Sequence, residues 1–312
     1  MRIGLFPGQA SQDVGMGSDL FEIFPEARDM YDRADDLLGF KISTVSFEGP
    51  ADTLERTSRT QPALYVHGLV IWHLIDGQGA GFEYLAGHSL GELSALAAAG
   101  AFDFETGLKL VKIRSEVMQK ACDEHPGAMA ALMFLPEDQL EPLLQEAGTA
   151  GLIQAANINS KKQVVVSGER KPVERAVELA REFGAKKAVL LKVNGAFHSA
   201  LMSDAQAEFS EAVDAVAMHT PGIPVIPNVT AVATTDLEKI KSQLKAQLTS
   251  AVLWKKTMDC FSELGVSECY ELGPKSVLQG LAKDPLAGAT RAGISTVDDV
   301  NRFLEGHPAV AH

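Results

Sequence analysis

Residues 87–91 read GHSLG and carry the clearest chemical signal in the sequence. The pattern G-x-S-x-G places Ser89 near glycines, which lack a Cβ and so allow the sharp strand-to-helix turn that exposes a serine hydroxyl. We expect a strand over 82–86 and a small-residue helix over 92–99. The N-terminus of that helix would direct its free N–H groups toward an oxyanion formed at Ser89. We therefore interpret Ser89 as a nucleophile; the alternative is a serine that only caps the helix.

A serine at its ordinary pKa is a poor nucleophile and needs a base. The sequence has eight histidines. His198 lies in the segment GAFHS at 195–199, at an expected boundary between two parts of the chain, where clefts form. His67 and His73 are six residues apart on an apolar helix, the wrong spacing for a shared metal, and we expect them to be partly buried. His307 belongs to a tail that we expect to be mobile. His198 is therefore a candidate base.

The composition is that of a globular protein, with 46% apolar and 22% charged residues in 312 and a net charge of −13. This acidity argues against nucleic acid or an anionic membrane surface as a partner. The three cysteines indicate free thiols in a reducing cytosol. Neither a signal peptide nor an apolar run of about 20 residues is present, so we expect a cytoplasmic protein. No His, Cys and Asp cluster has metal-ligand spacing, and we expect no metal and no tightly bound cofactor.

The elements that position these residues follow two patterns. Strands alternate with helices at the start of the chain, which predicts an open α/β fold with a parallel sheet. The middle of the chain has the order β-α-β-β-α-β, which is ferredoxin-like. We expect a large domain over 1–126 and 195–312, carrying an inserted small domain over 127–194. The elements expected are strands over 3–6, 82–86, 128–134, 152–157, 163–167 and 188–193, helices over 61–74, 92–99, 104–122, 136–147, 172–183, 205–216 and 236–248, and a closing strand, loop and helix over 269–281.

Ordered segments along nearly the whole chain resemble the malonyl-CoA:acyl carrier protein transacylase family. The matching segments are FPGQASQ at 6–12, TQPA at 60–63, GHSLGE at 87–92, NINS at 157–160, AFHS at 196–199, QLTS at 247–250 and ELGP at 271–274, together with Arg114 and Met118. The resemblance implies an α/β-hydrolase-like large domain with an inserted ferredoxin-like domain. It also implies transfer of malonyl from CoA to the phosphopantetheine thiol of an acyl carrier protein, in fatty-acid or polyketide synthesis.

The resemblance further implies roles for individual residues. Ser89 would carry the malonyl group, and His198 would act first as base and then as acid. Gln9 and the backbone N–H of Leu90 would form the oxyanion hole. Arg114 would bind the free carboxylate of malonyl. The backbone carbonyl of Gln247 would orient His198, so no acidic third member is required. The other positions expected to contact substrate are His88, Gln61, Met118, Asn157 and Phe197.

Arg114 has a competing interpretation, because an arginine on a charged amphipathic helix is normally a solvated surface residue. Only the resemblance favours an inward guanidinium that meets an anion. The sequence departs from the family pattern at Ser115, at 249–252 (TSAV) and at 273–276 (GPKS), where we expect effects on packing and on a surface loop. Residues 92–94 and 101–109 look closer to freestanding acyltransferases that serve polyketide synthases.

The sequence leaves two rival functions open. One is an acyl hydrolase that clears stalled carrier proteins, and the other is a catalytically silent subunit that only docks the carrier. A silent subunit would not need Ser89 and His198, and a hydrolase would not need Arg114 for a carboxylate. Because carrier proteins are expected to be acidic, docking on this acidic chain would need a local basic patch. The lysine pairs at 161–162 and 186–187 are the candidates.

Overall fold

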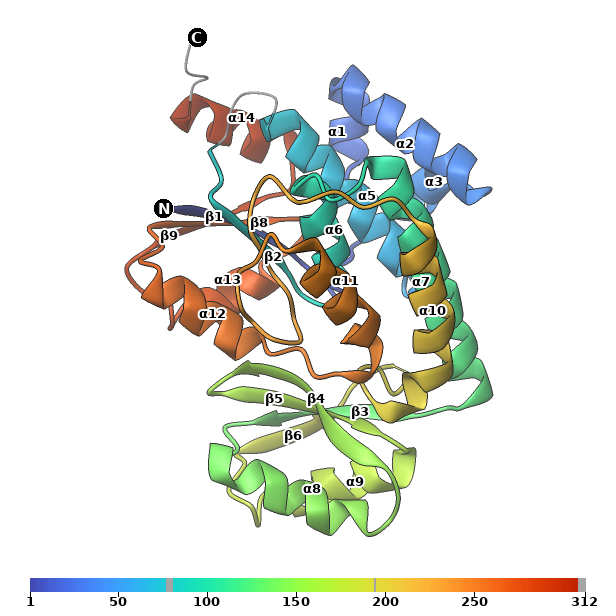
Figure 1. Cartoon of the computed structure of the whole chain (residues 1–312), viewed down its shortest axis with the longest axis vertical. Coiled ribbons are helices and arrows are strands. Elements are labelled where there is room, and N and C mark those ends of the chain that lie inside the picture. The colour runs from blue at the N-terminus through green and yellow to red at the C-terminus, as the bar shows by residue number, and fades with distance from the viewer. Residues whose placement is uncertain (77–80, 194, 308–312) are drawn as a thin grey trace.

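The computed structural model describes residues 1–76, 81–193 and 195–307 (Figure 1). Its larger part is built on a five-stranded sheet with the order β7-β2-β1-β8-β9, in which every pair of neighbours is parallel. The expected parallel sheet is therefore confirmed. The strands are β1 (Arg2–Phe6), β2 (Tyr84–Gly87), β7 (Val225–Ile226), β8 (Glu268–Leu272) and β9 (Thr290–Ile294).

Helices cover both faces of this sheet, as expected for parallel strands. Along β1, Ile3 and Leu5 belong to one buried cluster, whereas Phe6 belongs to the other. The helices are α1 (Ser18–Ile23), α2 (Pro25–Leu38), α3 (Ile42–Glu48), α4 (Ala51–Leu54), α5 (Thr57–Asp76), α6 (Gly91–Ala98), α7 (Phe104–Glu124), α10 (Ser203–Ala215), α11 (Leu237–Ala246), α12 (Trp254–Glu263), α13 (Val277–Ala282) and α14 (Val297–Gly306). Across the described part of the chain, none of the helices combines the length and the apolar character that a membrane crossing requires.

A second sheet, with the order β4-β5-β3-β6, is antiparallel throughout. Its strands are β3 (Ala128–Met133), β4 (Ile153–Ser160), β5 (Gln163–Gly168) and β6 (Lys187–Leu190), with α8 (Leu140–Gly148) and α9 (Arg170–Leu179) between them. This order confirms the ferredoxin-like arrangement. Figure 1 shows the two helices on the face turned away from the large sheet. The limits 127–194 and 1–126 with 195–312 remain a prediction, since Asn194 lies outside the described residues.

The two parts of the molecule meet at the C-terminal end of β2. From the small sheet, Asn159 on β4 hydrogen bonds to His88, just after β2. Asn157 on the same strand pairs with Val252 of the large part in an isolated parallel bridge. The strand β4 therefore runs directly beside the turn that carries Ser89.

Candidate active site

Ser89 sits on a tight turn between β2 and α6. Its φ is +52°, a left-handed conformation that strains a residue with a side chain. The flanking glycines permit the packing: a Cβ on Gly87 would lie 1.8 Å from the backbone of Gly91, and one on Gly91 would lie 2.0 Å from the carbonyl oxygen of Phe6. The strand, turn and helix expected around the G-x-S-x-G motif are all present. This turn presents the Ser89 hydroxyl at the end of the sheet.

His198 lies against Ser89 in a buried position. Its Nε2 is 2.8 Å from Ser89 Oγ, while its Nδ1 is 3.0 Å from the carbonyl oxygen of Gln247 and 3.1 Å from that of Ser250. Because carbonyl oxygens only accept, Nδ1 carries the proton, and Nε2 is free to accept from the serine hydroxyl. Burial, and secondarily the charge of Arg114, lower the pKa of His198 to about 3, so the resting ring is neutral. The Ser–His pair has the geometry of a nucleophile and its base.

Arg114 on α7 is fully buried rather than solvated. Its Nη1 donates to Gln61 Oε1 at 2.7 Å, and its Nη2 donates to Ser89 Oγ at 3.1 Å and to Gln247 Oε1 at 2.9 Å. Its Nε is buried and has no partner within the described residues. Burial lowers the pKa of Arg114 to about 10, which still leaves the guanidinium charged at neutral pH. A charged fork with a free donor beside Ser89 is suited to a planar carboxylate.

Gln61, Met118 and Gln247 belong to the same buried network. The amide Nε2 of Gln61 donates to the thioether sulfur of Met118 at 3.4 Å, which turns its oxygen toward Arg114. Gln247 contributes twice, because its backbone oxygen orients His198 and its side chain contacts Arg114. The geometry thus brings three of the residues expected from the resemblance to the Ser–His pair.

The structure gives less direct support for the two oxyanion-hole residues that the resemblance implies than for the Ser–His pair. The N–H of Leu90, one residue after Ser89, has no hydrogen-bond acceptor in the parts of the chain that the structure covers. Gln9 lies on the loop after β1, and its side chain donates to Thr57 Oγ1 at 3.3 Å. That loop packs on the nucleophile turn, since a Cβ on Gly8 would lie 2.5 Å from the carbonyl oxygen of His88. The roles of Leu90 and Gln9 remain predictions.

The remaining expected substrate contacts surround this centre. His88 Nε2 is 2.9 Å from Asn159 Oδ1, and burial lowers its pKa. Phe197 is nearly buried and lines a cavity at the rim of the site. No hydrogen bond within the described residues joins Asn157 to Ser89, His198 or Arg114. Its Oδ1 is buried without a partner there, so a substrate role for Asn157 rests on the resemblance alone.

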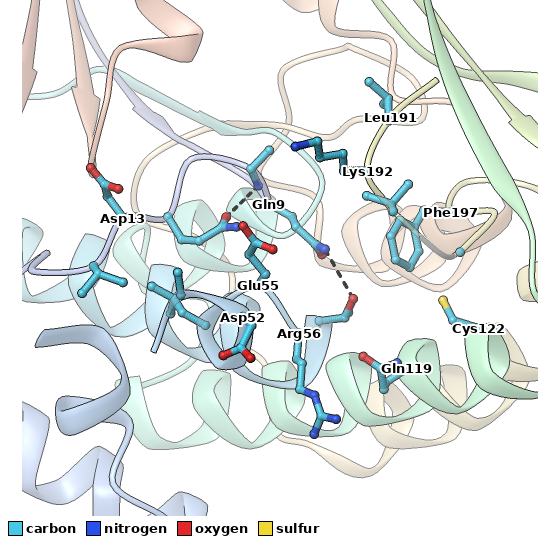
Figure 2. A pocket seen from close by; sticks show the side chains of 18 of the residues that line it. Gln9, Asp13, Asp52, Glu55, Arg56, Gln119, Cys122, Leu191, Lys192 and Phe197 are labelled. Carbon is cyan, nitrogen blue, oxygen red and sulfur yellow. Dashed lines mark hydrogen bonds between the residues drawn. The ribbon is translucent and has the colours of Figure 1, made fainter. Parts of the chain in front are cut away.

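A cavity of about 700 Å³ lies beside the site (Figure 2). Gln9 and Phe197 line it, whereas neither Ser89 nor His198 does. Lys275, expected on a surface loop, also lines it, and its Nζ donates to the carbonyl oxygen of Gln12 at 2.8 Å. The remaining lining residues are Ala10, Gln12, Asp13, Val14, Ala51, Asp52, Leu54, Glu55, Arg56, Thr57, Gln119, Cys122, Asp123, Leu191, Lys192, Val193 and Gly195. The volume of this cavity lies within the range of cavities that bind small organic ligands.

Comparison with known proteins identifies the family. The model of the acyl transferase domain matches residues 5–304. The malonyl CoA-acyl carrier protein transacylase of Bacillus subtilis strain 168 is 41% identical over 280 residues, covering 89% of this chain and 88% of that protein. The chain belongs to the malonyl CoA-acyl carrier protein transacylase family. The resemblance seen in the sequence is thereby confirmed.

Three further proteins are similar to this chain over nearly its whole length. The polyketide biosynthesis malonyl CoA-acyl carrier protein transacylase PksC of the same organism is 42% identical over 279 residues, covering 89% of this chain and 94% of that one. The crystal structure of the acyl-carrier-protein-S-malonyltransferase from Bartonella henselae has a TM-score of 0.94 at 40% identity and covers 98% of this chain and 99% of its own. A malonyl-transacylase in complex with a type II polyketide synthase acyl-carrier protein, PlMCAT:AntF, also has a TM-score of 0.94, at 34% identity, and covers 98% and 100% of the two chains.

The structure adds polar residues to the site that sequence reasoning missed. Asn228 accepts from the backbone N–H of Ser89 at 2.7 Å and donates to the carbonyl oxygen of Gly87 at 2.7 Å. Gln154 on β4 donates to the carbonyl oxygen of His198 at 3.2 Å. Both are single polar residues in segments without a motif, so nothing in their spacing marked them. Glu92, in contrast, stands within the matched segment GHSLGE but was given no role.

His307 is packed, contrary to the expectation of a mobile tail. Its Nδ1 is 2.9 Å from the carbonyl oxygen of Phe303, and its Nε2 is 3.1 Å from the carboxylate of Glu268. His312 lies outside the described residues. Within the residues that the structure covers, no group of three or more His, Cys, Asp or Glu side chains could hold a metal ion. The expectation of no metal and no cofactor remains a prediction.

Proposed function

We propose that this protein is a malonyltransferase that moves malonyl from CoA to the phosphopantetheine thiol of an acyl carrier protein. The observation that carries the proposal is the environment of one atom. Ser89 Oγ is 2.8 Å from the neutral base His198 and 3.1 Å from the buried charge of Arg114. The pair supplies an acylation site, and the arginine supplies a partner for the free carboxylate. The names of the relatives, a malonyl CoA-acyl carrier protein transacylase and a polyketide biosynthesis member of the same family, support the same activity.

The first half-reaction follows from the hydrogen bonds around Ser89. As Oγ attacks the thioester carbonyl, His198 Nε2 takes its proton, while the Nδ1 proton remains held by two carbonyl oxygens. The oxyanion that forms would accept from the N–H of Leu90 and from Gln9. When the intermediate collapses, the thiolate of CoA leaves and receives the proton from His198. The product is a malonyl ester on Ser89.

The second half-reaction reverses these steps with a different thiol. The phosphopantetheine thiol of the carrier gives its proton to His198 and attacks the ester, and the serine recovers a proton as it leaves. Throughout, Arg114 would hold the malonyl carboxylate through charge-assisted hydrogen bonds. Each proton and each developing charge is assigned to a group of this chain, so the proposal includes no metal and no tightly bound cofactor; malonyl-CoA is a substrate.

The carrier protein would dock on a local basic surface of the small sheet. The overall charge of −13 opposes an acidic partner. Of the two lysine pairs, Lys162 is already paired with Asp284 at 2.5 Å. Lys186 lies over the ring of Phe134, with its Nζ 4.8 Å from the centroid, and Lys187 begins the exposed edge strand β6. The proposal therefore centres docking on Lys186 and Lys187, and it places the protein in the cytoplasm, where its thiols would stay reduced.

The test is incubation with radiolabelled malonyl-CoA, with and without carrier protein. We expect stable label on the wild-type protein, transfer of that label to the carrier, and no label on Ser89→Ala, which lacks the nucleophile. Rapid release of free malonate without stable label would instead indicate the acyl hydrolase. Absence of any turnover would indicate the silent docking subunit. Label on Ser89→Ala at the wild-type level would refute the nucleophile assignment.

A further inference from the structure

Glu92 is a buried carboxyl group that stands one helical turn behind the nucleophile. It lies on α6, three residues after Ser89, and is 1% exposed. Its Oε2 accepts from the backbone N–H of Asn228 at 2.9 Å and from Gln247 Nε2 at 2.8 Å. Its Oε1 is buried without a hydrogen-bond partner in the described residues. A buried carboxyl group lowers the stability of a protein unless its oxygens are hydrogen bonded. The two hydrogen bonds that Glu92 accepts therefore indicate that it holds neighbouring groups in position.

One of its partners clamps the nucleophile turn. Asn228 Oδ1 accepts from the N–H of Ser89, and its Nδ2 donates to the carbonyl oxygen of Gly87, both at 2.7 Å. These bonds hold the turn from both sides, across the residue whose φ is +52°. Glu92 fixes the backbone of Asn228 from which this clamp extends. The strained conformation of Ser89 is therefore supported through Glu92.

The other partner links the base to the arginine. Gln247 Nε2 donates to Glu92 and to the carbonyl oxygen of Ser89 at 3.1 Å, so its Oε1 is left to accept from Arg114. An amide has one donor end and one acceptor end. If Glu92 offered no acceptor, the amide of Gln247 could turn and present an N–H group to the guanidinium. The same residue carries the carbonyl oxygen that orients His198.

We propose that Glu92 is a positioning residue, whose Oε2 fixes the amide of Gln247 and the clamp of Asn228 and thereby aligns Ser89, His198 and Arg114. The inference rests on the proposed acyl transfer at Ser89. Glu92 makes no hydrogen bond to Ser89 Oγ or to the His198 ring in the described structure, so it acts through its neighbours. Glu92 contributes a hydrogen-bond acceptor, Oε2, at a fixed position. A negative charge is not what it contributes, because burial raises the pKa of Glu92 to about 7 and its ionised form is not strongly favoured.

The acceptor role distinguishes the substitutions at this position. Glu92→Gln keeps the shape and one oxygen that can accept from both Asn228 and Gln247. Glu92→Leu keeps the bulk and removes the acceptor, and Glu92→Asp draws the acceptor back by one methylene. Since a misplacement of about 1 Å can cost roughly 100-fold in rate, we expect kcat for malonyl transfer to fall about 100-fold in Glu92→Leu and about tenfold or more in Glu92→Asp. Glu92→Gln should stay within about fivefold of wild type.

The KM for the carrier and a matched control variant distinguish a positioning role of Glu92 from a general effect on folding. The KM for the carrier should stay within about threefold in all three variants, because the carrier docks outside the buried network. Glu271 is another fully buried carboxyl that accepts two backbone N–H groups, those of Leu278 and Gln279, and within the described residues it makes no hydrogen bond to Ser89 or His198. Glu271→Leu should lower the thermal midpoint while leaving kcat of the folded protein within about threefold of wild type.

Three outcomes would overturn the inference. The first is a folded Glu92→Leu with wild-type kcat. The second is a folded Glu92→Gln that loses as much kcat as Glu92→Leu. The third is a kcat loss in Glu271→Leu equal to that in Glu92→Leu. If Glu92→Leu does not fold, Glu92→Asp carries the first comparison. Absence of malonyl transfer by the wild-type protein would instead count against the proposed function, so the two failures are distinguishable.

Discussion

At the scale of single residues, Arg114 holds a positive charge inside the protein with neutral hydrogen-bond partners. These partners are the side-chain oxygens of Gln61, Gln247 and Ser89. Glu92 favours the charged form through space, but burial outweighs it, and the pKa of Arg114 is lowered to about 10. A buried charge without an ion partner is unfavourable until an anion arrives. A carboxylate on the acyl group would supply that anion, whereas an acetyl group would not.

Replacing Arg114 therefore tests the choice of acyl group. We expect Arg114→Ala to depress malonyl transfer by about 30- to 5000-fold, which corresponds to about 2–5 kcal/mol for a truncated buried charge pair. Acetyl transfer should fall much less. The measurement is kcat/KM for malonyl-CoA and acetyl-CoA in parallel, with Lys109→Ala, an exposed residue of the same helix, as the control. Equal losses with both donors would show that Arg114 does not bind the carboxylate.

The residues of the site differ in how far the sequence could predict them. Ser89 is marked by its motif, and His198 by its place near a boundary together with the resemblance to a family. The position of Arg114 could not be predicted from its helix alone, because its charged neighbours indicate a solvated face. Only the resemblance to the family predicted a buried guanidinium. Asn228 and Gln154 were not predictable, because each acts through one side-chain amide whose partners lie far away in the chain.

At the scale of elements, the site depends on how closely α6 approaches the central strand. A Cβ on Gly91 would lie 2.0 Å from the carbonyl oxygen of Phe6 and 3.0 Å from that of Pro7. Both obstacles are backbone atoms, which cannot rotate away as a side chain can. The first residue of α6 and the end of β1 must therefore stay in contact without an intervening side chain. The position of Ser89 is set by this contact.

Gly91→Ala should damage both stability and acylation. We expect the free energy of unfolding to fall by about 1–3 kcal/mol, as for other overpacked positions, and the rate of labelling of Ser89 to fall at least tenfold. The matched control is Gly280→Ala on α13, where a Cβ would meet nothing within 4 Å and should be neutral or stabilising. Urea unfolding and the rate of radiolabelling measure the two effects. If Gly91→Ala were labelled at the wild-type rate, the close approach of α6 to the end of β1 would not be required for acylation of Ser89.

Periodicity predicted some of the elements but not all of them, since the amphipathic helices α2, α12 and α14 had no prediction. The expected helix over 104–122 is α7, and all four strands of the small sheet form, because each carries apolar residues at a regular spacing. The expected helix over 136–147 instead opens with a 3-10 turn at Glu137–Gln139. The short helices α1, α3 and α4 had no prediction, since none is longer than two turns. Packing against α2 and α5, rather than their own sequence, holds them.

At the scale of the whole molecule, charge is distributed unevenly around the cavity. On the large part of the molecule acidic lining residues outnumber basic ones, with Asp13, Asp52, Glu55 and Asp123 against Arg56 and Lys275, whereas Lys192 lines the cavity on the side of the small sheet. Lys186 and Lys187 lie a few residues before Lys192 in the chain. An acidic carrier would be repelled by the first side and attracted by the second. The net charge of −13 therefore describes the molecule as a whole and not the surface on which the carrier would dock.

Reversing one charge at this surface tests the docking proposal. Lys187→Glu should raise the KM for the carrier about three- to tenfold at low salt, while acylation of Ser89 by malonyl-CoA stays unchanged. The effect should shrink as salt is added, because exposed charges are screened over about 10 Å at 0.1 M ionic strength. The control is Lys171→Glu on α9, which is also exposed on the small part of the molecule but lies beneath the other face of its sheet. Both variants change the net charge equally, so equal increases in KM would mean that the carrier responds to the total charge and would refute docking at Lys187.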